Sequence, residues 1–309
     1  MNEFDVIVIG GGAAGLSAAL VLSRARRTVA VVDAGEPRNA PVARMHGFLS
    51  RDGMPPRDLL AAGRDEVKGY GGVIVDGTVA GIVRNAGFDV LLAGGPQLSA
   101  RRVLVATGLR DELPDIPGVR EHWGRDVLHC PYCHGYEVRD QPVGVIGGVA
   151  DGDQHAQLVR QWCSDVVLFA PTGTLTADQR EQLVARAICV VDGTVERLLV
   201  EDDRLYGVEL DDGRVIRRSA VFVRPHFVPN DDLLAGLGCA VDDDGWVISD
   251  ATGRTSVAGV WVAGNAAGPR AQVITAASEG SAAAMALNAD LVEEDVRRAV
   301  QAFRDGRPD

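Results

Sequence analysis

The sequence lacks a hydrophobic run long enough to cross a membrane. Its longest apolar stretches, such as residues 17–23 and 145–150, fall well short of the roughly 20 residues that a spanning helix needs. It also lacks a basic, apolar leader, since Met1-Asn2-Glu3-Phe4-Asp5 runs directly into a strand-like segment. We therefore expect a cytoplasmic protein that makes no membrane contact.

Basic residues are also in short supply. The 309 residues include 31 Lys and Arg against 43 Asp and Glu, which gives a formal charge of −12 at pH 7. This deficit disfavours a nucleic-acid partner, because phosphate contacts dominate such interfaces. Apolar side chains, at 46%, and glycine, with 37 residues, are abundant instead. This composition and length are typical of an α/β protein with two domains.

Cysteine is scarce, which disfavours a scaffold held together by disulfides. Of the 5 cysteines, three are isolated, and the other two belong to Cys130-Pro131-Tyr132-Cys133-His134-Gly135. In a reducing compartment a CxxC pair is more often catalytic than structural. At a helix N-terminus the helix dipole lowers the thiol pKa toward neutrality and makes the thiol a nucleophile for disulfide exchange. The segment therefore predicts a redox dithiol.

Two other uses of the same segment stay open from its residues. The string CxxCH is also the attachment site of c-type haem, and His129 and His134 flank the pair as zinc ligands would. Haem attachment normally needs an exported chain, and a structural zinc site prefers a second CxxC. We favour the redox dithiol over both and expect no metal.

The N-terminal residues carry the fingerprint of a dinucleotide site. An apolar strand at 5–9 leads into Gly10-Gly11-Gly12-Ala13-Ala14-Gly15 and a helix, and the next apolar run ends at Asp33, 23 residues past Gly10. Gly10 suits a tight turn, Gly12 a close approach to pyrophosphate, and Gly15 close helix–strand packing. Asp33 is placed to accept ribose hydroxyls. Flavin and nicotinamide dinucleotides share this pattern, so the rest of the chain must decide between them.

A second strand, glycine turn and helix lies inside the first. Strands at 87–92 and 98–106 close the opening part of the first fold. The chain returns to this fold near 260–265, before a helix at 272–289 and a terminal solvated helix from Leu291 onward. The inserted segments are a strand at 143–146, Gly147-Gly148, a helix at 154–162, a strand at 166–169 and a meander at 207–210, 215–217 and 220–223. We therefore predict an α/β fold with two Rossmann-like nucleotide-binding domains, the second inserted into the first.

These motifs together resemble the low-molecular-weight thioredoxin reductases over essentially the whole chain. The resemblance implies an FAD-binding domain made of residues 1–113 and 241–309, an inserted NAD(P)H-domain-like module at 114–240 that carries the CxxC, and a homodimer. It also implies flavin contacts from the turns and strand ends of the FAD-binding domain. These are Gly10, Gly12, Ala14, Gly15, Asp33, Ala34, Val79, Ala106, Thr107, Gly108, Gly264, Asn265, Gln272 and Val273.

The resemblance also assigns roles within the dithiol. It implies that Cys133 faces the isoalloxazine ring and that Cys130 is the interchange thiol that meets substrate. Ordinary reductases have an aspartate acid–base after the second cysteine, and this chain has His134. An imidazole, with an ordinary pKa of about 6.5, can take a thiol proton at neutral pH. His129 can play the same part, and the sequence does not rank the two.

The second nucleotide turn departs from the family. Val149 stands where a glycine would let the backbone approach pyrophosphate, and Asp151 adds negative charge beside it. The following strand ends in Phe169-Ala170-Pro171, with neither the basic pair of NADP-dependent relatives nor the ribose-binding acid of NAD-dependent ones. We therefore expect the inserted domain to keep its fold and to lose nicotinamide binding.

The chain most resembles the FAD-dependent dithiol oxidases of gliotoxin- and holomycin-type biosynthesis, in which CxxCHG with an aromatic inside the pair recurs. Tyr132 is that aromatic here. The resemblance implies that a small-molecule dithiol is oxidised to its intramolecular disulfide, with oxygen as final acceptor and hydrogen peroxide as product. Three alternatives remain: a disulfide reductase fed by NADPH, ferredoxin or another donor; a non-catalytic redox sensor; and a protein–thiol oxidase.

Overall fold

The computed structural model describes residues 3–147 and 151–306, and it divides into two compact units. Unit 1 comprises Met1–Ala40, Pro55–Arg110 and Phe227–Asp309, and unit 2 comprises Pro41–Met54 and Asp111–His226. Each unit has its own sheet, mixed in unit 1 and parallel in unit 2, and unit 2 interrupts unit 1 in the sequence. The predicted α/β fold, with one nucleotide fold inserted into another, is confirmed.

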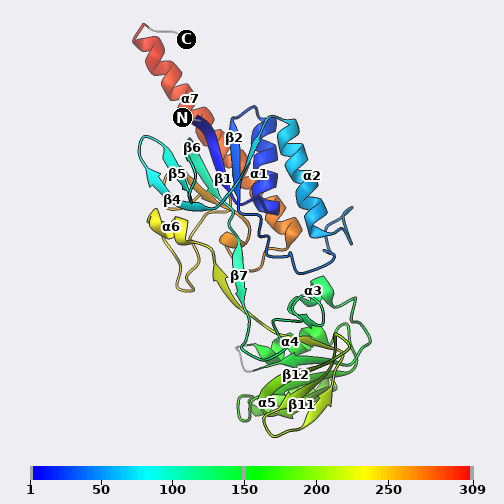
Figure 1. Cartoon of the computed structure of the whole chain (residues 1–309). Coiled ribbons are helices and arrows are strands. Elements are labelled where there is room, and N and C mark those ends of the chain that lie inside the picture. Colours follow the sequence, from blue (N-terminus) through cyan, green and yellow to red (C-terminus); the bar gives the residue numbers. More distant parts are fainter. Residues whose placement is uncertain (1–2, 148–150, 307–309) are drawn as a thin grey trace. The chain divides into compact units, whose positions relative to one another are not determined.

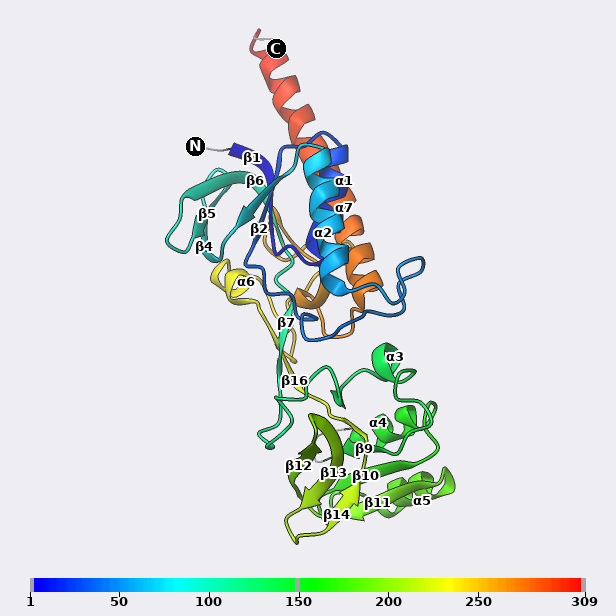
Figure 2. The ribbon, with the colours of Figure 1, turned by 45° about the vertical axis from the view of Figure 1, so that its right-hand side comes forward.

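Unit 1 is built on a seven-stranded sheet with three long helices on one face (Figures 1 and 2). Its strand order is β3-β2-β1-β6-β5-β4, and β17 pairs in parallel with the end of β6. Strands β4 and β5 form an antiparallel hairpin. The strands are β1 (Glu3–Ile9), β2 (Val29–Asp33), β3 (Val73–Asp76), β4 (Val79–Arg84), β5 (Phe88–Leu92), β6 (Gln97–Val105) and β17 (Val260–Val262). The helices are α1 (Ala13–Arg24), α2 (Pro56–Gly69), α6 (Asp232–Gly236), η1 (Gly264–Ala266) and α7 (Val273–Arg304).

Alternation along β1 divides the core of unit 1 into two layers. Val6 and Val8 pack in a cluster with the buried side chains of α1 and α7. Ile7 and Ile9 lie in a second cluster, which includes Leu234 from α6. Because successive side chains of a strand point to opposite faces, one run of apolar residues covers both sides of the sheet. This fixes the end of β1 and places the glycine turn that follows it.

Helix α7 extends well beyond the segment predicted at 272–289. Its later turns bury Leu291 and place acidic side chains against two arginines of β6, with Arg102 Nε 2.7 Å from Asp290 Oδ2 and Arg102 Nη2 2.7 Å from Glu294 Oε2. Arg101 also pairs with Asp295. The sequence interpretation treated this part of the helix as solvated throughout. In the structure, one side of it forms ion pairs with β6.

Unit 2 has a five-stranded parallel sheet, in the order β11-β10-β9-β15-β8. Helices α4 and α5 pack on one face, where Ala156, Val159 and Leu183 are buried. The antiparallel sheet β12-β13-β14 covers the other face. The elements are β8 (Val127–Leu128), α3 (Pro131–His134), β9 (Val143–Ile146), α4 (Gly152–Val159), β10 (Val166–Ala170), α5 (Ala177–Ala185), β11 (Ile188–Asp192), β12 (Val195–Glu201), β13 (Arg204–Leu210), β14 (Val215–Arg217) and β15 (Ala220–Phe222).

The units differ from the domain ranges expected from the sequence in two segments. Residues 227–240 were expected in the inserted module, but Leu234 and Cys239 lie in the core of unit 1. Residues 41–54 group with unit 2, where Met45 is buried and His46 pairs with Glu137. Strands β7 (Leu109–Glu112) and β16 (His226–Pro229) pair where the chain passes between units. Among the described residues, no helix combines the length and apolar character of a membrane span.

Candidate active site

The glycine turn after β1 leaves open space in front of helix α1. Gly10 has a φ of +105°, and a Cβ there would overlap the Ala106 carbonyl oxygen. A Cβ on Gly15 would overlap the carbonyl oxygen of Gly10, so these glycines bring strand and helix together. Gly12 is the extended N-cap of α1, and its Cβ would meet no heavy atom within 4 Å. The space beside Gly12 is thus free for a phosphate group, at a helix N-terminus that favours one.

Asp33 ends β2 beside this turn. Its Oδ1 accepts a hydrogen bond of 3.0 Å from the Gly11 amide, and its side chain is 16% exposed. Arg64 of α2 pairs with Asp33 and donates to Asp76 Oδ1 at 3.0 Å. Sequence reasoning missed Arg64, since no motif marks it. The signal lies in the parallel pairing of β2 with β3, which places Asp33 beside Asp76.

The remaining predicted cofactor residues gather around the same turn from three parts of unit 1. Gly264 has a φ of +69°, a Cβ there would lie 2.9 Å from the Ala14 Cβ, and its amide donates to Glu279 Oε2 at 2.9 Å. Burial raises the pKa of Glu279. The Asn265 side chain donates to the Gly268 carbonyl at 3.0 Å. Gln272 is the N-cap of α7, and Val273 begins that helix.

Five further predicted positions lie at strand ends or next to them. Thr107 Oγ1 donates to the Asn230 carbonyl at 2.7 Å, and the Asn230 amide returns a bond of 3.0 Å to the Thr107 carbonyl. The Gly77 amide donates to the Asp33 carbonyl at 2.9 Å, which brings the start of β4 at Val79 toward the end of β2. Ala34 follows Asp33 directly. Ala106, whose carbonyl lies against Gly10, precedes Thr107 and the left-handed Gly108.

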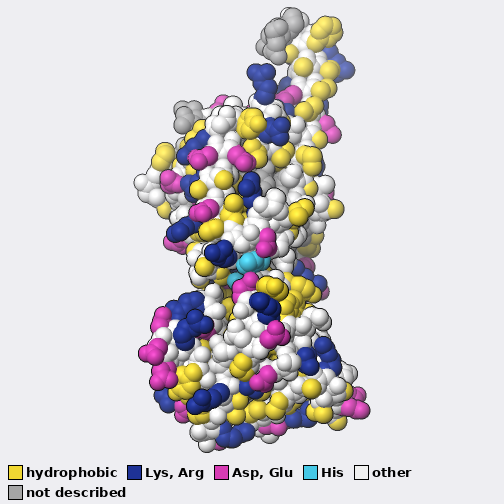
Figure 3. Space-filling view, turned by 90° about the vertical axis from the view of Figure 1, so that its right-hand side faces the viewer, with side chains coloured by type: hydrophobic (Ala, Val, Ile, Leu, Met, Phe, Trp, Pro, Cys, Tyr) yellow, Lys and Arg dark blue, Asp and Glu magenta, His cyan; other side chains and the backbone are white. Residues whose placement is uncertain are grey.

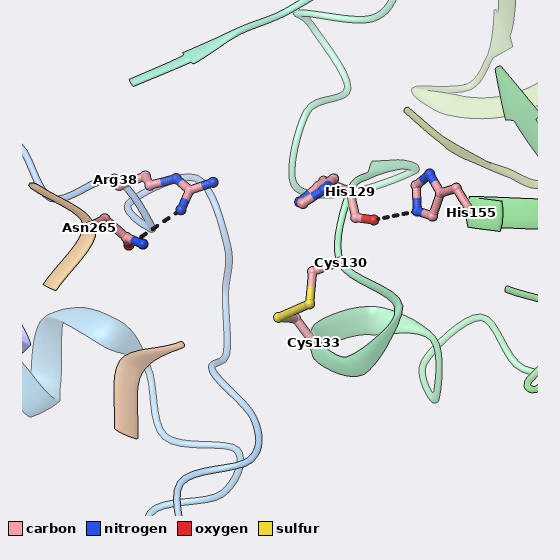
Figure 4. The surroundings of a disulfide bond; sticks show 6 residues. All are labelled: Arg38, His129, Cys130, Cys133, His155 and Asn265. Atoms are coloured by element: carbon pink, nitrogen blue, oxygen red, sulfur yellow. Dashed lines mark hydrogen bonds between the residues drawn. A yellow bond between two sulfur atoms is a disulfide. The ribbon is translucent and has the colours of Figure 1, made fainter. Parts of the chain in front are cut away.

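The predicted dithiol of unit 2 is a disulfide between Cys130 and Cys133, whose Cα atoms are 5.2 Å apart (Figure 4). Cys130 is the N-cap of the short helix α3, and its carbonyl accepts hydrogen bonds of 3.1 Å from the amides of Cys133 and His134. Both sulfur atoms are therefore in the disulfide, and neither cysteine is a free thiol. In the part of the chain that the structure describes, no group of His, Cys, Asp or Glu is arranged to hold a metal ion.

The Trp162 ring packs against helix α3. A Cβ on Gly135 would lie 2.8 Å from Trp162 Cδ2, so glycine lets the indole approach the end of α3. The Trp162 ring meets Tyr132 edge to face, with centroids 5.4 Å apart, while Tyr132 stays 64% exposed. Trp162 therefore packs against both the exposed Tyr132 and the end of α3. Tyr132 presents an aromatic surface between the two cysteines.

His134 has a pKa below the ordinary imidazole value. Burial lowers its pKa, Glu137 raises it, and His46 lowers it further, for a net shift below the ordinary imidazole value. The imidazole is therefore neutral at pH 7 and able to accept a proton. Glu137 Oε1 lies 3.4 Å from His46 Nε2, so the residues around His134 come from both the CxxC segment and the 41–54 loop. The sequence marks the loop at 38–49 as a candidate border of the flavin or the dithiol, and His46 meets Glu137 next to the dithiol segment.

The second glycine turn keeps the packing of the first and differs elsewhere. A Cβ on Gly152 would lie 3.0 Å from the Gly147 Cα, as Gly15 presses on Gly10 in unit 1. Asp151, the N-cap of α4, has its Oδ2 3.0 Å from Arg224 Nη1. At the end of β10, Phe169 and Ala170 are buried hydrocarbon. The predicted obstruction by Val149 falls outside the described residues.

Two nucleotide folds, one of which carries a redox disulfide at a helix N-cap, define a thiol–disulfide oxidoreductase. Comparison with known proteins gives the family. The family model of the pyridine nucleotide-disulphide oxidoreductases matches residues 4–280. The chain belongs to this family. It is a flavin thiol–disulfide oxidoreductase of the thioredoxin reductase kind, as the resemblance predicted.

Individual relatives cover nearly the whole chain. The crystal structure of HlmI is 58% identical in sequence, with a TM-score of 0.95 over 98% of this chain and 97% of that one. The structure of an oxidoreductase from Agrobacterium tumefaciens is 36% identical, with a TM-score of 0.87 over 94% of this chain and 99% of that one. Thioredoxin reductase sirT of Leptosphaeria maculans is 30% identical over 313 residues, which is 95% of this chain and 96% of sirT.

Proposed function

We propose that this protein is an FAD-dependent dithiol oxidase that closes an intramolecular disulfide in a small-molecule dithiol and passes the electrons to oxygen. The observation that carries the proposal is the second nucleotide turn. There Asp151 is paired with Arg224, and β10 ends in buried Phe169 and Ala170, without a group for a nicotinamide ribose or its phosphate. The 58% identity to HlmI supports an oxidase among the members of this family.

FAD fits the residues of unit 1. The open space at Gly12 leaves room for its pyrophosphate, and Asp33 offers a carboxylate to its ribose. Arg64 holds that carboxylate in place, while the backbone around Gly264 and Val273 lies on the same side as the α1 N-terminus, because Gly264 contacts Ala14. When bound, FAD supplies the two-electron redox group that connects the dithiol to oxygen.

The exchange chemistry that we propose uses the cysteine roles that the family resemblance implies, with Cys130 as the thiol that meets substrate. A substrate thiolate attacks Cys130 Sγ, which breaks the Cys130–Cys133 bond, forms a mixed disulfide and releases Cys133 as a thiolate. The second substrate thiol gives its proton to His134 and attacks the substrate sulfur of the mixed disulfide, which frees Cys130. The substrate has then lost two electrons and two protons. Oxygen takes up both and becomes hydrogen peroxide, and the cysteine disulfide is restored.

The oxidase is tested by stoichiometry. We expect a small aliphatic or aromatic dithiol to be oxidised with consumption of one oxygen and release of one peroxide per disulfide formed, measured with an oxygen electrode and a peroxidase-coupled assay. Reduced thioredoxin, offered at the same concentration, distinguishes a protein substrate from a small one. Consumption of NADPH with reduction of a disulfide, and no oxygen uptake with any dithiol, would reject the proposal.

A disulfide reductase is the second candidate. It is favoured by the glycine packing of the second turn, which retains the architecture of a nucleotide site, and by relatives that carry the name thioredoxin reductase. It uses the same cysteines with the electrons flowing in the opposite direction. NADPH, ferredoxin or another flavoprotein would then be the donor.

We also propose that the protein is a homodimer in the cytoplasm. Along α7, Met285, Val292, Val296 and Phe303 follow spacings of seven, four and seven residues, which place them on one side of a helix, and all are exposed, Phe303 by 77%. Figure 3 shows hydrophobic side chains along this helix where it extends from unit 1. A second copy of the chain fits such a stripe. Sedimentation of the Val296→Asp/Phe303→Asp variant should show monomers, and a dimer of unchanged affinity would exclude this surface.

A further inference from the structure

We propose that His155 is a positioning residue that holds Cys130 in register with Cys133, so that helix α4, which follows the nucleotide turn of unit 2, serves the dithiol. The His155 side chain lies on α4, and its Nε2 is 2.9 Å from the backbone carbonyl oxygen of His129 (Figure 4). His129 immediately precedes Cys130. His155 thus gives the peptide that joins them a hydrogen bond from a side chain of another element.

The direction of this hydrogen bond follows from its acceptor. A carbonyl oxygen can only accept, so Nε2 of His155 carries the hydrogen and donates it. Burial lowers the pKa of His155, its bond to His129 raises it, and the nearby Arg224 lowers it further, with a net shift downward. The ring is therefore neutral at pH 7, with one donor nitrogen, and that donor is used here.

The ring of His155 contacts two other rings. Its centroid lies 5.9 Å from that of His129 and 6.0 Å from that of Phe222 on β15, the latter edge to face. The helix that carries it is fixed at its start by the Asp151–Arg224 pair and at Asp153 by Gln179, whose Nε2 lies 3.1 Å from the Asp153 carboxylate. His155 therefore projects from a helix held at several points, with little freedom to change its reach.

Holding this peptide affects the dithiol directly. The peptide unit is planar and trans, so fixing the His129 carbonyl also fixes the Cys130 amide and the start of its side chain. When the disulfide gains two electrons and two protons, its S–S bond breaks and the covalent ring opens. From then on only noncovalent contacts keep Cys130 Sγ near Cys133 Sγ. The His155 bond raises the effective concentration of one thiol toward the other and favours closure of the disulfide.

The test is the thiol–disulfide equilibrium of the holoenzyme in glutathione buffers without oxygen. The fraction of oxidised Cys130–Cys133 is read by alkylation and peptide mass spectrometry, which separates this pair from Cys163, Cys189 and Cys239. His155→Phe keeps the size of the ring and removes the donor. We expect its equilibrium constant for disulfide formation to fall by about 3- to 10-fold, the value of one neutral hydrogen bond.

Two variants separate positioning from packing. His155→Gln retains a donor of similar reach and should restore the equilibrium to within about twofold of the parent. Phe222→Leu disturbs the same ring cluster without removing the donor and should also stay within about twofold. If His155→Phe is not recovered folded, His155→Leu takes its place in the same comparison.

The outcomes are decisive in both directions. A fall in the Phe or Leu variant with recovery in the Gln variant supports the proposal. An unchanged equilibrium in the donor-free variant, or an equal fall in Phe222→Leu, overturns it. The measurement does not depend on which dithiol is the substrate or on oxygen as acceptor, so failure of the proposed oxidase activity would leave this result readable.

Discussion

The two nucleotide folds of this chain share a turn and differ in what lies around it. In each, the third glycine of the turn presses on the first, Gly15 on Gly10 and Gly152 on Gly147, so the strand and helix pack alike. In unit 1 the strand after the helix ends in Asp33, which is held by Gly11 and Arg64. In unit 2 the matching strand ends in buried Phe169 and Ala170.

The comparison shows that the packing of a nucleotide fold and its ligand contacts are separable. The glycines that let strand and helix meet are retained in both units, because losing them costs the fold itself. Among the described residues, a carboxylate at the end of the strand after the helix is present only in unit 1. In unit 2, the carboxylate at the helix N-terminus is bound by Arg224, and the same helix holds the peptide before Cys130 through His155. Helix α4 thus packs on its strand as α1 does in unit 1, but its polar side chains contact Arg224 and the His129 carbonyl.

The largest effect should come from removing the feature that only unit 2 has. Cys130→Ser leaves no disulfide for a substrate thiolate to attack, and we expect dithiol turnover to be lost entirely while bound flavin stays at the parental level. Cys189→Ser, which removes an exposed free cysteine, is the matched control and should turn over normally. Turnover of Cys130→Ser at the parental rate would overthrow the assigned exchange chemistry.

Substitution at Gly12 should break the ligand contacts of unit 1 without breaking its packing. A Cβ at Gly12 meets no atom of the protein, and the backbone there is extended, so Gly12→Leu should fold. The side chain would fill the space of the pyrophosphate and remove about two hydrogen bonds to a charged group, which weakens FAD binding by roughly 100-fold or more.

The measurement is FAD affinity, by fluorescence titration of the deflavinated protein, together with thermal stability. Gly15→Ala is the contrasting variant, because its Cβ overlaps the Gly10 carbonyl and should destabilise unit 1 itself. Full flavin content in purified Gly12→Leu would refute the placement of the pyrophosphate.

His134 gives unit 2 an acid–base group that its fold alone does not supply. Because burial holds its pKa below the ordinary imidazole value, turnover should persist below pH 6.5 and fall only as the pH passes through the lowered pKa, where the imidazole takes up a proton. His134→Asn should reduce kcat by about 100-fold and remove this acidic limb. The exposed His226 offers the control His226→Asn, with an unchanged profile. An acidic limb that survives in His134→Asn would assign the base elsewhere.

The smallest effect concerns the ion pair at the start of α4. Asn tolerates the left-handed backbone of Asp151, whose φ is +67°, so Asp151→Asn removes the charge alone. Both side chains of the pair are partly exposed, and we expect a loss of at most about 1 kcal/mol in unfolding free energy. Turnover with dithiol should change by less than about twofold. Flavin reduction by NADPH should stay as slow as in the parent, because β10 still lacks a ribose acceptor; a large gain would show that Asp151 alone blocks the nucleotide.

The sequence was sufficient for features that depend on neighbours along the chain. The strand, turn and helix at Gly10–Gly15 and the CxxC at a helix N-cap follow from local periodicity and glycine placement. The contacts of Arg64 with Asp33, of His155 with the His129 carbonyl, and of His46 with Glu137 join residues 26 to 91 positions apart. Such contacts depend on which strands pair and where loops pack, and no local pattern contains that information.

The extent of α7 illustrates the same limit. Its sequence after residue 289 is charged and was interpreted as solvated, since charge alone does not reveal a partner. Asp290 and Glu294 meet Arg102 of β6, almost 190 residues earlier. Only the packing of the helix on the sheet shows which of these charged side chains have a partner.

The most direct test of the account is anaerobic stopped-flow spectroscopy of the flavin band. The protein is mixed separately with NADPH, NADH and a small dithiol, and oxygen is then admitted. The account predicts that the dithiol bleaches the flavin, that neither nicotinamide does so on the same timescale, and that reoxidation releases peroxide. Bleaching by NADPH as fast as by the dithiol would contradict it and would show that the nucleotide fold of unit 2 still binds its ligand.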